Sequence, residues 1–364
     1  MINVEDLQKI LKINNCNFFS GVPDSVLKEF SKSLENNKNH IIATNEGSAV
    51  SLGIGNYLST KKVPCIYMQN SGLSNAINPL ISIAHKKVYS IPLILVIGWR
   101  GSPNKKDEPQ HKAKGEITPN ILKLLNIDYT ILRNKEDLTK FDKKIKLARK
   151  QKSIVACLIE EGTLNKTTSK KIKEYTYNLD KEIFLKELLT LLPINTKVIS
   201  STGYNSREIM YLKEKYKTIK TKNFYMVGGM GHTMSVALGY SLSSNNKTIC
   251  IDGDGSLLMH LGGITTLANF AKSNLKYILL NNNAHDSVGG QSTYSNSIDF
   301  GKFSKSLGFN KFVLIKNKLN LKNKLRNFIF DKKLCFMEVK VSGSKIKNLP
   351  RPDDLIKIKN KFMD

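Results

Sequence analysis

The sequence predicts an α/β protein made of two three-layer α/β/α domains, each built on a parallel sheet. Short apolar runs rich in β-branched residues alternate with amphipathic segments along the whole chain, which is typical of βαβ units. The chain has 364 residues, enough for two domains that each bury a core. A polar stretch rich in Thr and Lys interrupts the pattern near the middle. We therefore expect a first domain over residues 1–163, a linker over 164–180 and a second domain over 181–364.

The elements of the first half follow from its hydrophobic pattern. Residues 99–119 form a long polar segment with three prolines, which predicts a loop. Loops of this length inside compact domains tend to be functional or disordered. Apolar residues with the helical period predict amphipathic helices at 4–12 and 136–150. Apolar runs predict buried strands at 40–44, 63–68, 91–98 and 153–160.

The second half repeats this order of elements. A helical segment is expected over 257–272, after the second predicted strand of this half. Strands that alternate with helices are joined by crossover connections, so each sheet should be parallel. Apolar runs predict strands at 196–200, 247–251, 275–280 and 334–339.

Composition narrows the class of protein. The formal net charge is +27, with 57 Lys and Arg against 30 Asp and Glu. The basic residues are spread along the chain and are not interleaved with aromatic residues, so we expect no nucleic-acid partner. The longest apolar stretch, 88–99, is too short to span a bilayer, and the amino-terminal residues lack the features of a signal peptide. We predict a cytoplasmic protein with no membrane partner, whose five scattered cysteines are reduced core thiols.

The string CIDGDGSLLMH places one carboxylate, Asp254, between two glycines at the end of an apolar run. A tight turn would explain the string, because glycine and aspartate both favour turns. Asn282, however, follows the next predicted strand, one βαβ unit later. Both side chains should therefore lie at the carboxyl edge of the sheet, where ligands bind in doubly wound folds. Their oxygen atoms suit Mg²⁺, and Ser256 opens a helix whose amino terminus attracts a diphosphate.

A GDG turn followed, one βαβ unit later, by an NN pair resembles the signature of thiamine diphosphate enzymes. The resemblance implies thiamine diphosphate and Mg²⁺ as cofactors. It implies that the metal ligands are Asp254, the side chain of Asn282 and the carbonyl of Ala284, where many members have glycine. It also places Gly253, Gly255 and Ser256 beside the diphosphate.

The string ATNEGSAVSLGIGNYLST places Glu46 in the first turn of a predicted helix that follows a strand. Complementarity with the helix dipole would explain an acidic residue there. The resemblance implies instead that Glu46 hydrogen-bonds N1′ of the aminopyrimidine, a task that suits a desolvated carboxyl with a raised pKa. The resemblance also implies that the carbonyl of Gly228 accepts the 4′-amino hydrogen and that Thr202 contacts the diphosphate. Met230 matches the residue that supports the bent cofactor, although core packing would also explain a methionine.

Longer strings narrow the family. GVPDS, MQNSGLSNAINPL, GWRG…DEPQH, STGYNSRE, GGMGH and HDSVGGQST resemble the thiamine diphosphate decarboxylases that act on phosphonopyruvate and sulfopyruvate, over nearly the whole chain. The resemblance implies decarboxylation of 3-phosphonopyruvate to phosphonoacetaldehyde and CO₂, in phosphonate biosynthesis of the 2-aminoethylphosphonate type. Because sulfopyruvate enzymes are often divided into two chains, a single chain favours phosphonopyruvate. The alternatives are a sulfopyruvate decarboxylase and a non-catalytic regulatory subunit, and the intact Glu46, Asp254 and Asn282 argue against the second.

The matched strings also supply candidates for substrate binding, proton transfer and assembly. An anionic head group requires charge-assisted hydrogen bonds, although Lys105 and Lys106 could equally be solvated surface residues. Glu46 and Asp254 lie in different halves, which come from different chains in this family. We therefore expect a homodimer or higher homo-oligomer with active sites at the subunit interface. The substrate-binding candidates are Arg100, Lys105, Lys106 and Gln110, and the proton-transfer candidates beside Glu46 are Asp24, His111 and His285.

Overall fold

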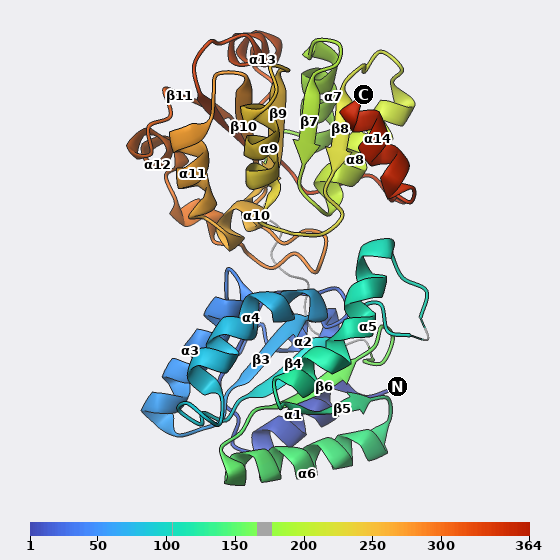
Figure 1. The fold of residues 1–364 in the computed structure, drawn as a ribbon, viewed down its shortest axis with the longest axis vertical. Coiled ribbons are helices and arrows are strands. Elements are labelled where there is room, and N and C mark those ends of the chain that lie inside the picture. The colour runs from blue at the N-terminus through green and yellow to red at the C-terminus, as the bar shows by residue number, and fades with distance from the viewer. Residues whose placement is uncertain (104, 166–176) are drawn as a thin grey trace. The chain divides into compact units, whose positions relative to one another are not determined.

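The computed structural model describes residues 1–103, 105–165 and 177–364. The described residues divide into two compact units, one made of residues up to 165 and the other of residues from 177 onwards. Each unit is a parallel sheet with helices on both faces (Figure 1), which confirms the predicted fold class. Most of the predicted linker, 164–180, lies outside the described residues. Leu164, at its start, still pairs with Ile2 of the first unit.

The first unit contains a six-stranded sheet whose strands run parallel in the order β2-β1-β3-β4-β6-β5. Successive residues of a strand point to opposite faces, so its helices form two layers. The strands are β1 (Phe19–Gly21), β2 (His40–Ile42), β3 (Cys65–Gln69), β4 (Ile94–Gly98), β5 (Asp128–Leu132) and β6 (Val155–Ile159). The helices are α1 (Val4–Ile13), α2 (Lys28–Ser33), α3 (Glu46–Thr60), α4 (Leu73–Pro79), α5 (Pro109–Leu124) and α6 (Lys135–Gln151). Ile94 and Val96 of β4 share a core with α1, α2 and α6, and Leu95 and Ile97 share one with α3, α4 and α5.

The second unit repeats this architecture with the strand order β11-β12-β10-β9-β7-β8, again all parallel. One core lies under α7, α8 and α13, and the other under α9, α11 and α12. The strands are β7 (Lys197–Ser200), β8 (Lys222–Tyr225), β9 (Thr248–Gly253), β10 (Leu275–Asn281), β11 (Lys311–Ile315) and β12 (Cys335–Lys340). The helices are α7 (Lys181–Leu191), α8 (Tyr204–Lys215), α9 (Thr233–Leu242), α10 (Asp254–Met259), α11 (Gly263–Phe270), α12 (Phe300–Ser306), α13 (Leu321–Ile329) and α14 (Leu355–Met363).

The eight strands expected from the sequence are all present, as β2, β3, β4, β6, β7, β9, β10 and β12. The helices expected at 4–12 and 136–150 are α1 and α6. The hydrophobic pattern does not reveal β1, β5, β8 and β11. Of these, β5, β8 and β11 lie at sheet edges, where one side of a strand is not covered by a neighbour. β1 has only three residues, too few to show a period.

Two expectations about helices are wrong. The helical segment predicted over 257–272 is two helices, because α10 ends at Met259 and α11 begins at Gly263. The helix is interrupted at residues 260–262, just before Gly263. Two successive glycines, Gly262 and Gly263, disfavour a continuous helix here, because glycine costs about 1 kcal/mol in a helix interior relative to alanine.

The segment 99–119 is not a loop throughout, since α5 occupies its second half. Pro109 lies in the first turn of α5, where its missing N–H is not needed. Pro119 lies inside the helix and leaves the carbonyl of Gly115 without its usual i+4 donor. The indole Nε1 of Trp99 donates to that carbonyl at 2.9 Å. This hydrogen bond from Trp99 satisfies the carbonyl that Pro119 leaves without a donor, so α5 continues past a residue that usually ends a helix.

Two further expectations concern membrane-spanning helices and the cysteines. No helix of the described residues combines the length and apolarity needed to cross a bilayer. All five cysteines are buried and free, as expected for core thiols.

Candidate active site

The candidate metal ligands lie at the carboxyl edge of the second sheet. β9 and β10 are hydrogen-bonded neighbours and run parallel, so both end at this edge. Asp254 is the first residue of α10, directly after β9, and Asn282 directly follows β10. The two side chains therefore follow neighbouring strands at the same edge, as the spacing predicts.

Asp254 is a buried carboxylate with hydroxyl neighbours. Its Oδ2 atom accepts hydrogen bonds from Thr293 Oγ1 at 2.5 Å and from Ser295 Oγ at 3.0 Å. It forms no ion pair with the described residues, and burial raises its pKa to about 6. A buried carboxylate without a cationic partner is costly to ionise. A divalent cation would remove this cost, so the side chain fits a metal ligand.

Oxygen atoms dominate the surroundings of Asp254. Ser295 Oγ also lies 2.7 Å from Asn281 Oδ1 and 3.1 Å from Asn283 Oδ1. The amide oxygen of Asn282 accepts a hydrogen bond from the backbone N–H of Ala284 at 3.2 Å, which fixes its orientation. Carboxylate, amide and carbonyl oxygens are ligands suited to Mg²⁺ rather than to soft metals.

The two glycines beside Asp254 lie close to neighbouring turns. A Cβ atom on Gly255 would lie 3.0 Å from the ring of His285, and one on Gly253 would lie 3.1 Å from Nδ2 of Asn205. Asn205 donates to Ser201 Oγ at 3.0 Å, next to the half-buried Thr202. The turns after β7, β9 and β10 therefore meet around the GDG string.

His285 and Ser256 are both in contact with this group of turns. Burial lowers the pKa of His285 to about 4, so its imidazole is neutral at neutral pH. The hydroxyl of Ser256 accepts a hydrogen bond from the backbone N–H of Gly231 at 3.1 Å. Its oxygen is thus engaged within the protein, by the 226–232 turn, which also carries the half-buried Gly228 and Met230.

In the first unit, Glu46 is held at the start of α3. Asn45 caps the helix by accepting from the N–H of Ser48 at 2.8 Å. Glu46 is 5% exposed, and its Oε2 accepts from Asn75 Nδ2 at 2.8 Å. A Cβ atom on Gly72 would lie 2.1 Å from Oε1, so only glycine fits opposite this carboxylate. Burial raises the pKa of Glu46, although the bond from Asn75 partly opposes the shift.

Asp24 lies after β1 at the same edge of the first sheet. Its Oδ1 accepts from Gln69 Nε2 at 2.6 Å, and its Oδ2 accepts from the N–H groups of Val26 and Leu27 at 3.0 and 3.2 Å. Burial raises the pKa of Asp24, and these hydrogen bonds and the nearby Arg100 partly offset the rise. Both oxygens of Asp24 are therefore already occupied by donors.

Arg100 is engaged by a partner that the sequence does not indicate. Its guanidinium makes a two-pronged contact with Asp107, through Nε at 2.7 Å and through NH2, and NH1 donates to Ser25 Oγ at 3.1 Å. Burial favours the protonated form of Asp107, but hydrogen bonds from Arg100 and the N–H of Gly101 outweigh burial and lower its pKa. The charge of Arg100 is balanced by this pair.

The other candidates of the 99–119 segment differ in exposure. Lys105 and Lys106 are exposed and form no ion pair with the described residues. Gln110 is half-buried and donates to Glu108 Oε2 at 2.5 Å. His111 lies on α5, and burial together with the nearby Arg100 lowers its pKa to about 4. His111 and Arg100 are thus brought together, while the two lysines are left in solvent.

The sequence prediction misses the side chains that hold the candidates in place. Asn75 and Thr293 lie within the strings quoted for the resemblance, yet no periodicity marks them as partners of Glu46 and Asp254. The sequence feature that could have pointed to them is the presence of polar residues in short turns that the fold buries. The residues missed are Gln69, Asn75, Asp107, Asn205, Thr293 and Ser295.

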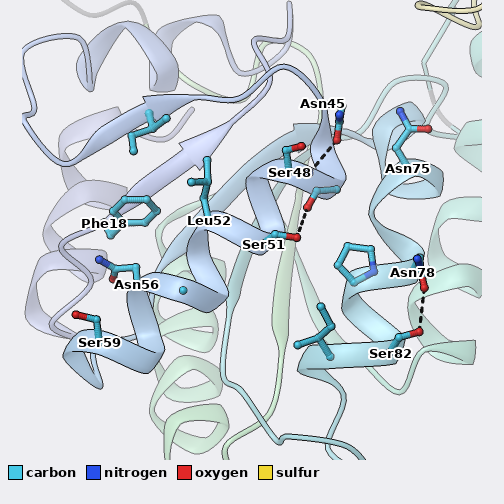
Figure 2. Close-up of a pocket in the computed structure, with 15 residues that line it drawn as sticks. Phe18, Asn45, Ser48, Ser51, Leu52, Asn56, Ser59, Asn75, Asn78 and Ser82 are labelled. Atoms are coloured by element: carbon cyan, nitrogen blue, oxygen red, sulfur yellow. Dashed lines mark hydrogen bonds between the residues drawn. The ribbon is translucent and has the colours of Figure 1, made fainter. Parts of the chain in front are cut away.

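A groove of about 960 Å³ runs between α3 and α4 (Figure 2) and is lined at one point by Asn45 and Asn75. Asn75 is the residue that donates to Glu46. One wall is α3 and the other is α4 with the turn that follows it. No charged residue lines it, although 24% of the chain is charged. Leu52, which lines the groove, is 39% exposed. The lining residues are Phe18, Ile41, Asn45, Gly47, Ser48, Ser51, Leu52, Gly55, Asn56, Ser59, Asn75, Asn78, Pro79, Ser82 and Ile83.

Comparison with known proteins identifies the family. The model for the amino-terminal TPP binding domain of thiamine pyrophosphate enzymes matches residues 3–123, and the model for the carboxy-terminal TPP binding domain matches residues 202–339. A phosphonopyruvate decarboxylase of Streptomyces hygroscopicus is 31% identical over 328 residues, which cover 85% of this chain and 80% of that protein. The chain belongs to this family of thiamine diphosphate-dependent decarboxylases. One from Streptomyces viridochromogenes is 32% identical over 74% of this decarboxylase and 70% of its own length.

A sulfopyruvate decarboxylase of Methanosarcina acetivorans is 26% identical, over 95% of this decarboxylase and 93% of its own length. A sulfopyruvate enzyme can therefore also be a single chain, so the number of chains does not by itself distinguish the two substrates. The protein is a thiamine diphosphate-dependent decarboxylase of the phosphonopyruvate and sulfopyruvate type.

Proposed function

We propose that this decarboxylase converts 3-phosphonopyruvate to phosphonoacetaldehyde and CO₂, in the biosynthesis of phosphonates of the 2-aminoethylphosphonate type. The observation that carries the proposal is the similarity to two phosphonopyruvate decarboxylases, at 31% and 32% identity over 80% and 70% of their lengths. The single-chain sulfopyruvate decarboxylase is 26% identical. Sulfopyruvate is therefore the second candidate substrate.

In the second unit, Asp254, Asn282 and the carbonyl of Ala284 would hold Mg²⁺. The absence of a cationic partner for Asp254 among the described residues supports this assignment. Gly253, Gly255, Ser256 and Thr202 would lie beside the diphosphate. The N–H of Gly231 uses only a lone pair of the Ser256 hydroxyl, so the hydroxyl hydrogen can still be donated to a diphosphate oxygen. Gly228 and Met230 would contact the aminopyrimidine end.

In the first unit, Glu46 would hold a proton at N1′ of the aminopyrimidine. Its burial supports this role, because burial raises the pKa of Glu46 and so lets the carboxyl hold a proton at a higher pH than an exposed glutamate does. When bound, thiamine diphosphate supplies the group that accepts the electron pair released as CO₂ leaves. Asp24, His111 and His285 are the proposed further proton carriers. Both imidazoles are neutral at neutral pH, so each has a nitrogen lone pair that can accept a proton.

The 99–119 segment would bind the anionic head group. Arg100 remains the proposed anchor, and its pairing with Asp107 would orient the guanidinium, as a carboxylate partner does in two-pronged contacts. Gln110 lies in the same segment, beside Glu108. Lys105 and Lys106 supply positive charge that no acidic residue of the described chain neutralises within ion-pair distance.

Substrate preference is the test of this proposal. A phosphonate can carry two negative charges and a sulfonate one, so a basic site gains more from the phosphonate. We expect kcat/KM for phosphonopyruvate to exceed that for sulfopyruvate by at least about tenfold, or about 1.4 kcal/mol, with pyruvate poorer still. The double variant Lys105→Ala/Lys106→Ala should narrow the gap between phosphonopyruvate and pyruvate, while Lys112→Ala, an exposed lysine of the same segment, should leave it unchanged. If the enzyme preferred sulfopyruvate in a competition assay, sulfopyruvate would be the substrate and the proposal would be wrong.

We further propose that the decarboxylase is at least a homodimer and that the groove beside α3 receives a second copy of the chain. Two molecules that each carry a formal charge of +27 repel one another, so a stable contact requires a face without like charges. Helix α3 and residues 73–84 contain one charged residue, the buried Glu46. A groove that is lined by Asn75, the partner of Glu46, would also place the active site near a subunit interface.

Introducing charge into the groove tests the assembly. The variant Leu52→Lys/Gly55→Lys should be monomeric in sedimentation velocity, because a two-fold contact would bring four added charges together. Leu124→Lys/Leu147→Lys is the matched control, since both leucines are exposed apolar residues of the same unit outside the groove. If the groove variant sediments like the wild-type protein, the second copy does not bind there.

A further inference from the structure

Asn70 is a buried amide without a role in the function proposed above. It lies directly after β3, within the string MQNSGLSNAINPL, and is 5% exposed. Its Nδ2 donates to the carbonyl of Arg100 and to Thr118 Oγ1, both at 2.9 Å. Its Oδ1 accepts from the N–H of Arg100 at 3.1 Å. Both hydrogens of the amide and its oxygen are therefore engaged by segments far away in the sequence.

The two bonds to Arg100 continue the pairing of β3 and β4 beyond the sheet. The last residues that these strands pair in register are Gln69 and Gly98. An amide side chain carries a donor and an acceptor on one planar group, so it can bond to both the N–H and the carbonyl of a single residue. Asn70 makes this two-point contact with Arg100. The backbone of Arg100 is thus fixed at the strand end, from which its guanidinium reaches Asp107.

The third bond of Asn70 leads to helix α5. Thr118 is 1% exposed, and its hydroxyl donates to the carbonyl of Lys114 at 2.5 Å. The hydroxyl oxygen keeps lone pairs, and one of them accepts from Asn70. The same helix carries Gln110 and His111. One buried amide therefore joins the start of the 99–119 segment to the helix that forms its second half.

Direct backbone contact leaves little freedom between these two parts of the segment. Gly101 has a φ angle of +69°, and a Cβ atom there would lie 1.9 Å from the carbonyl oxygen of His111. A Cβ atom on Gly115 would lie 1.7 Å from the carbonyl oxygen of Gly101. Residue 101 and α5 therefore lie backbone against backbone, and Asn70 supplies the hydrogen bonds beside this contact.

We propose that Asn70 is a positioning residue for head-group recognition, which holds the backbone of Arg100 and helix α5 at the spacing that presents the guanidinium to the phosphonate. It acts through these two elements and not by its own contact with the substrate. The part that Arg100 plays in recognition rests on the function proposed above. The hydrogen bonds of Asn70 are independent of that function and can be tested without cofactor or substrate.

Hydrogen exchange in the cofactor-free protein tests the contact with Arg100. In the variant Asn70→Ala, the N–H of Arg100 loses its acceptor. The Arg100 amide should then exchange about tenfold faster, as read from peptides that cover 99–103, because one hydrogen bond no longer protects it. Thr118→Val is the matched control, since it removes only the bond to α5, and exchange at Arg100 should stay unchanged. Unchanged exchange in Asn70→Ala, or equal acceleration in both variants, would overturn the inference.

Kinetics with two substrates separates positioning from a merely structural role. Asn70→Ala should lower the ratio of kcat/KM for phosphonopyruvate to kcat/KM for pyruvate about tenfold, because pyruvate has no anionic head group. In an Arg100→Ala background the same change should leave the ratio as it is, since both act through one guanidinium. If Asn70→Ala lowered both activities together and kept the ratio, the inference would be wrong. An Arg100→Ala enzyme with the wild-type ratio would overturn the head-group role of both residues, whereas the exchange experiment would still decide the bonds of Asn70.

Two variants of Thr118 test the connection to α5. Thr118→Val has nearly the shape of the native side chain but no hydroxyl, and it should lower the same ratio. Thr118→Ser keeps the hydroxyl and should retain the wild-type ratio. Wild-type ratios in both variants would overturn the part of the inference that concerns α5.

Discussion

Glu46→Gln is expected to lower kcat by at least about a hundredfold while thiamine diphosphate still binds. Glutamine has nearly the same shape and can keep a hydrogen bond with Asn75, but it cannot exchange a proton with N1′. The dissociation constant for thiamine diphosphate should change by no more than about tenfold, or about 1.4 kcal/mol. Steady-state kinetics and calorimetric binding measure the two quantities separately.

Glu136→Gln is a suitable control for this prediction, because Glu136 is an exposed carboxylate of α6 in the same unit. Its kcat should equal that of the wild-type enzyme. A Glu46→Gln enzyme that turns over at the wild-type rate would remove Glu46 from the proton exchange. Loss of binding with unchanged kcat at saturating cofactor would make it a binding residue only.

Asp254→Ala is expected to abolish retention of thiamine diphosphate, since the diphosphate would lose the Mg²⁺ that Asp254 is proposed to hold. Calorimetry with Mg²⁺ present should show no binding at cofactor concentrations that saturate the wild-type protein. Asp353→Ala, which removes an exposed carboxylate from the same unit, should bind normally. Unchanged affinity in the Asp254→Ala protein would refute the assignment.

The stability of the cofactor-free Asp254→Ala protein distinguishes lost binding from misfolding. Burial raises the pKa of Asp254 to about 6, above the ordinary value of 3.8. The folded state therefore holds this proton more tightly than the unfolded state, and its contribution to stability falls as pH rises from about 4 through 6. At pH 7.5 the wild-type protein without metal bears the full cost of a buried charge. The alanine variant escapes that cost but loses two hydrogen bonds, so its melting temperature should not fall substantially.

Several features could be predicted from the sequence because they depend on local patterns. The central strands are continuous apolar runs, since parallel strands covered on both faces must be apolar along their length. β4 and β6 illustrate this, because all their residues are buried. The GDG and NN strings could be placed at one sheet edge because parallel strands with helical crossovers end on the same side. The edge strands β5, β8 and β11 escape detection because part of their surface faces solvent.

The partners of the site residues depend on contacts between segments far apart in the chain. Asn75 reaches Glu46 from the following helix, and Ser295 reaches Asp254 from beyond the next strand. No local pattern specifies such a pair, because any polar residue in a turn has the same appearance in the sequence until the sheet brings two turns together. The same holds for Arg100, which the sequence presents as a free cation and the structure pairs with Asp107.

The sequence by itself determined the fold class, the order of the central strands along the chain and the chemical type of the metal-binding residues. These features follow from the hydrophobic period and from the chemistry of single side chains. Neither property depends on where folding places the residue. Only the tertiary structure decided that α5 tolerates Pro119 and that the Ser256 hydroxyl accepts a hydrogen bond from the N–H of Gly231. Each of these depends on a hydrogen bond between distant segments, and a hydrogen bond forms only where folding has brought donor and acceptor to about 3 Å.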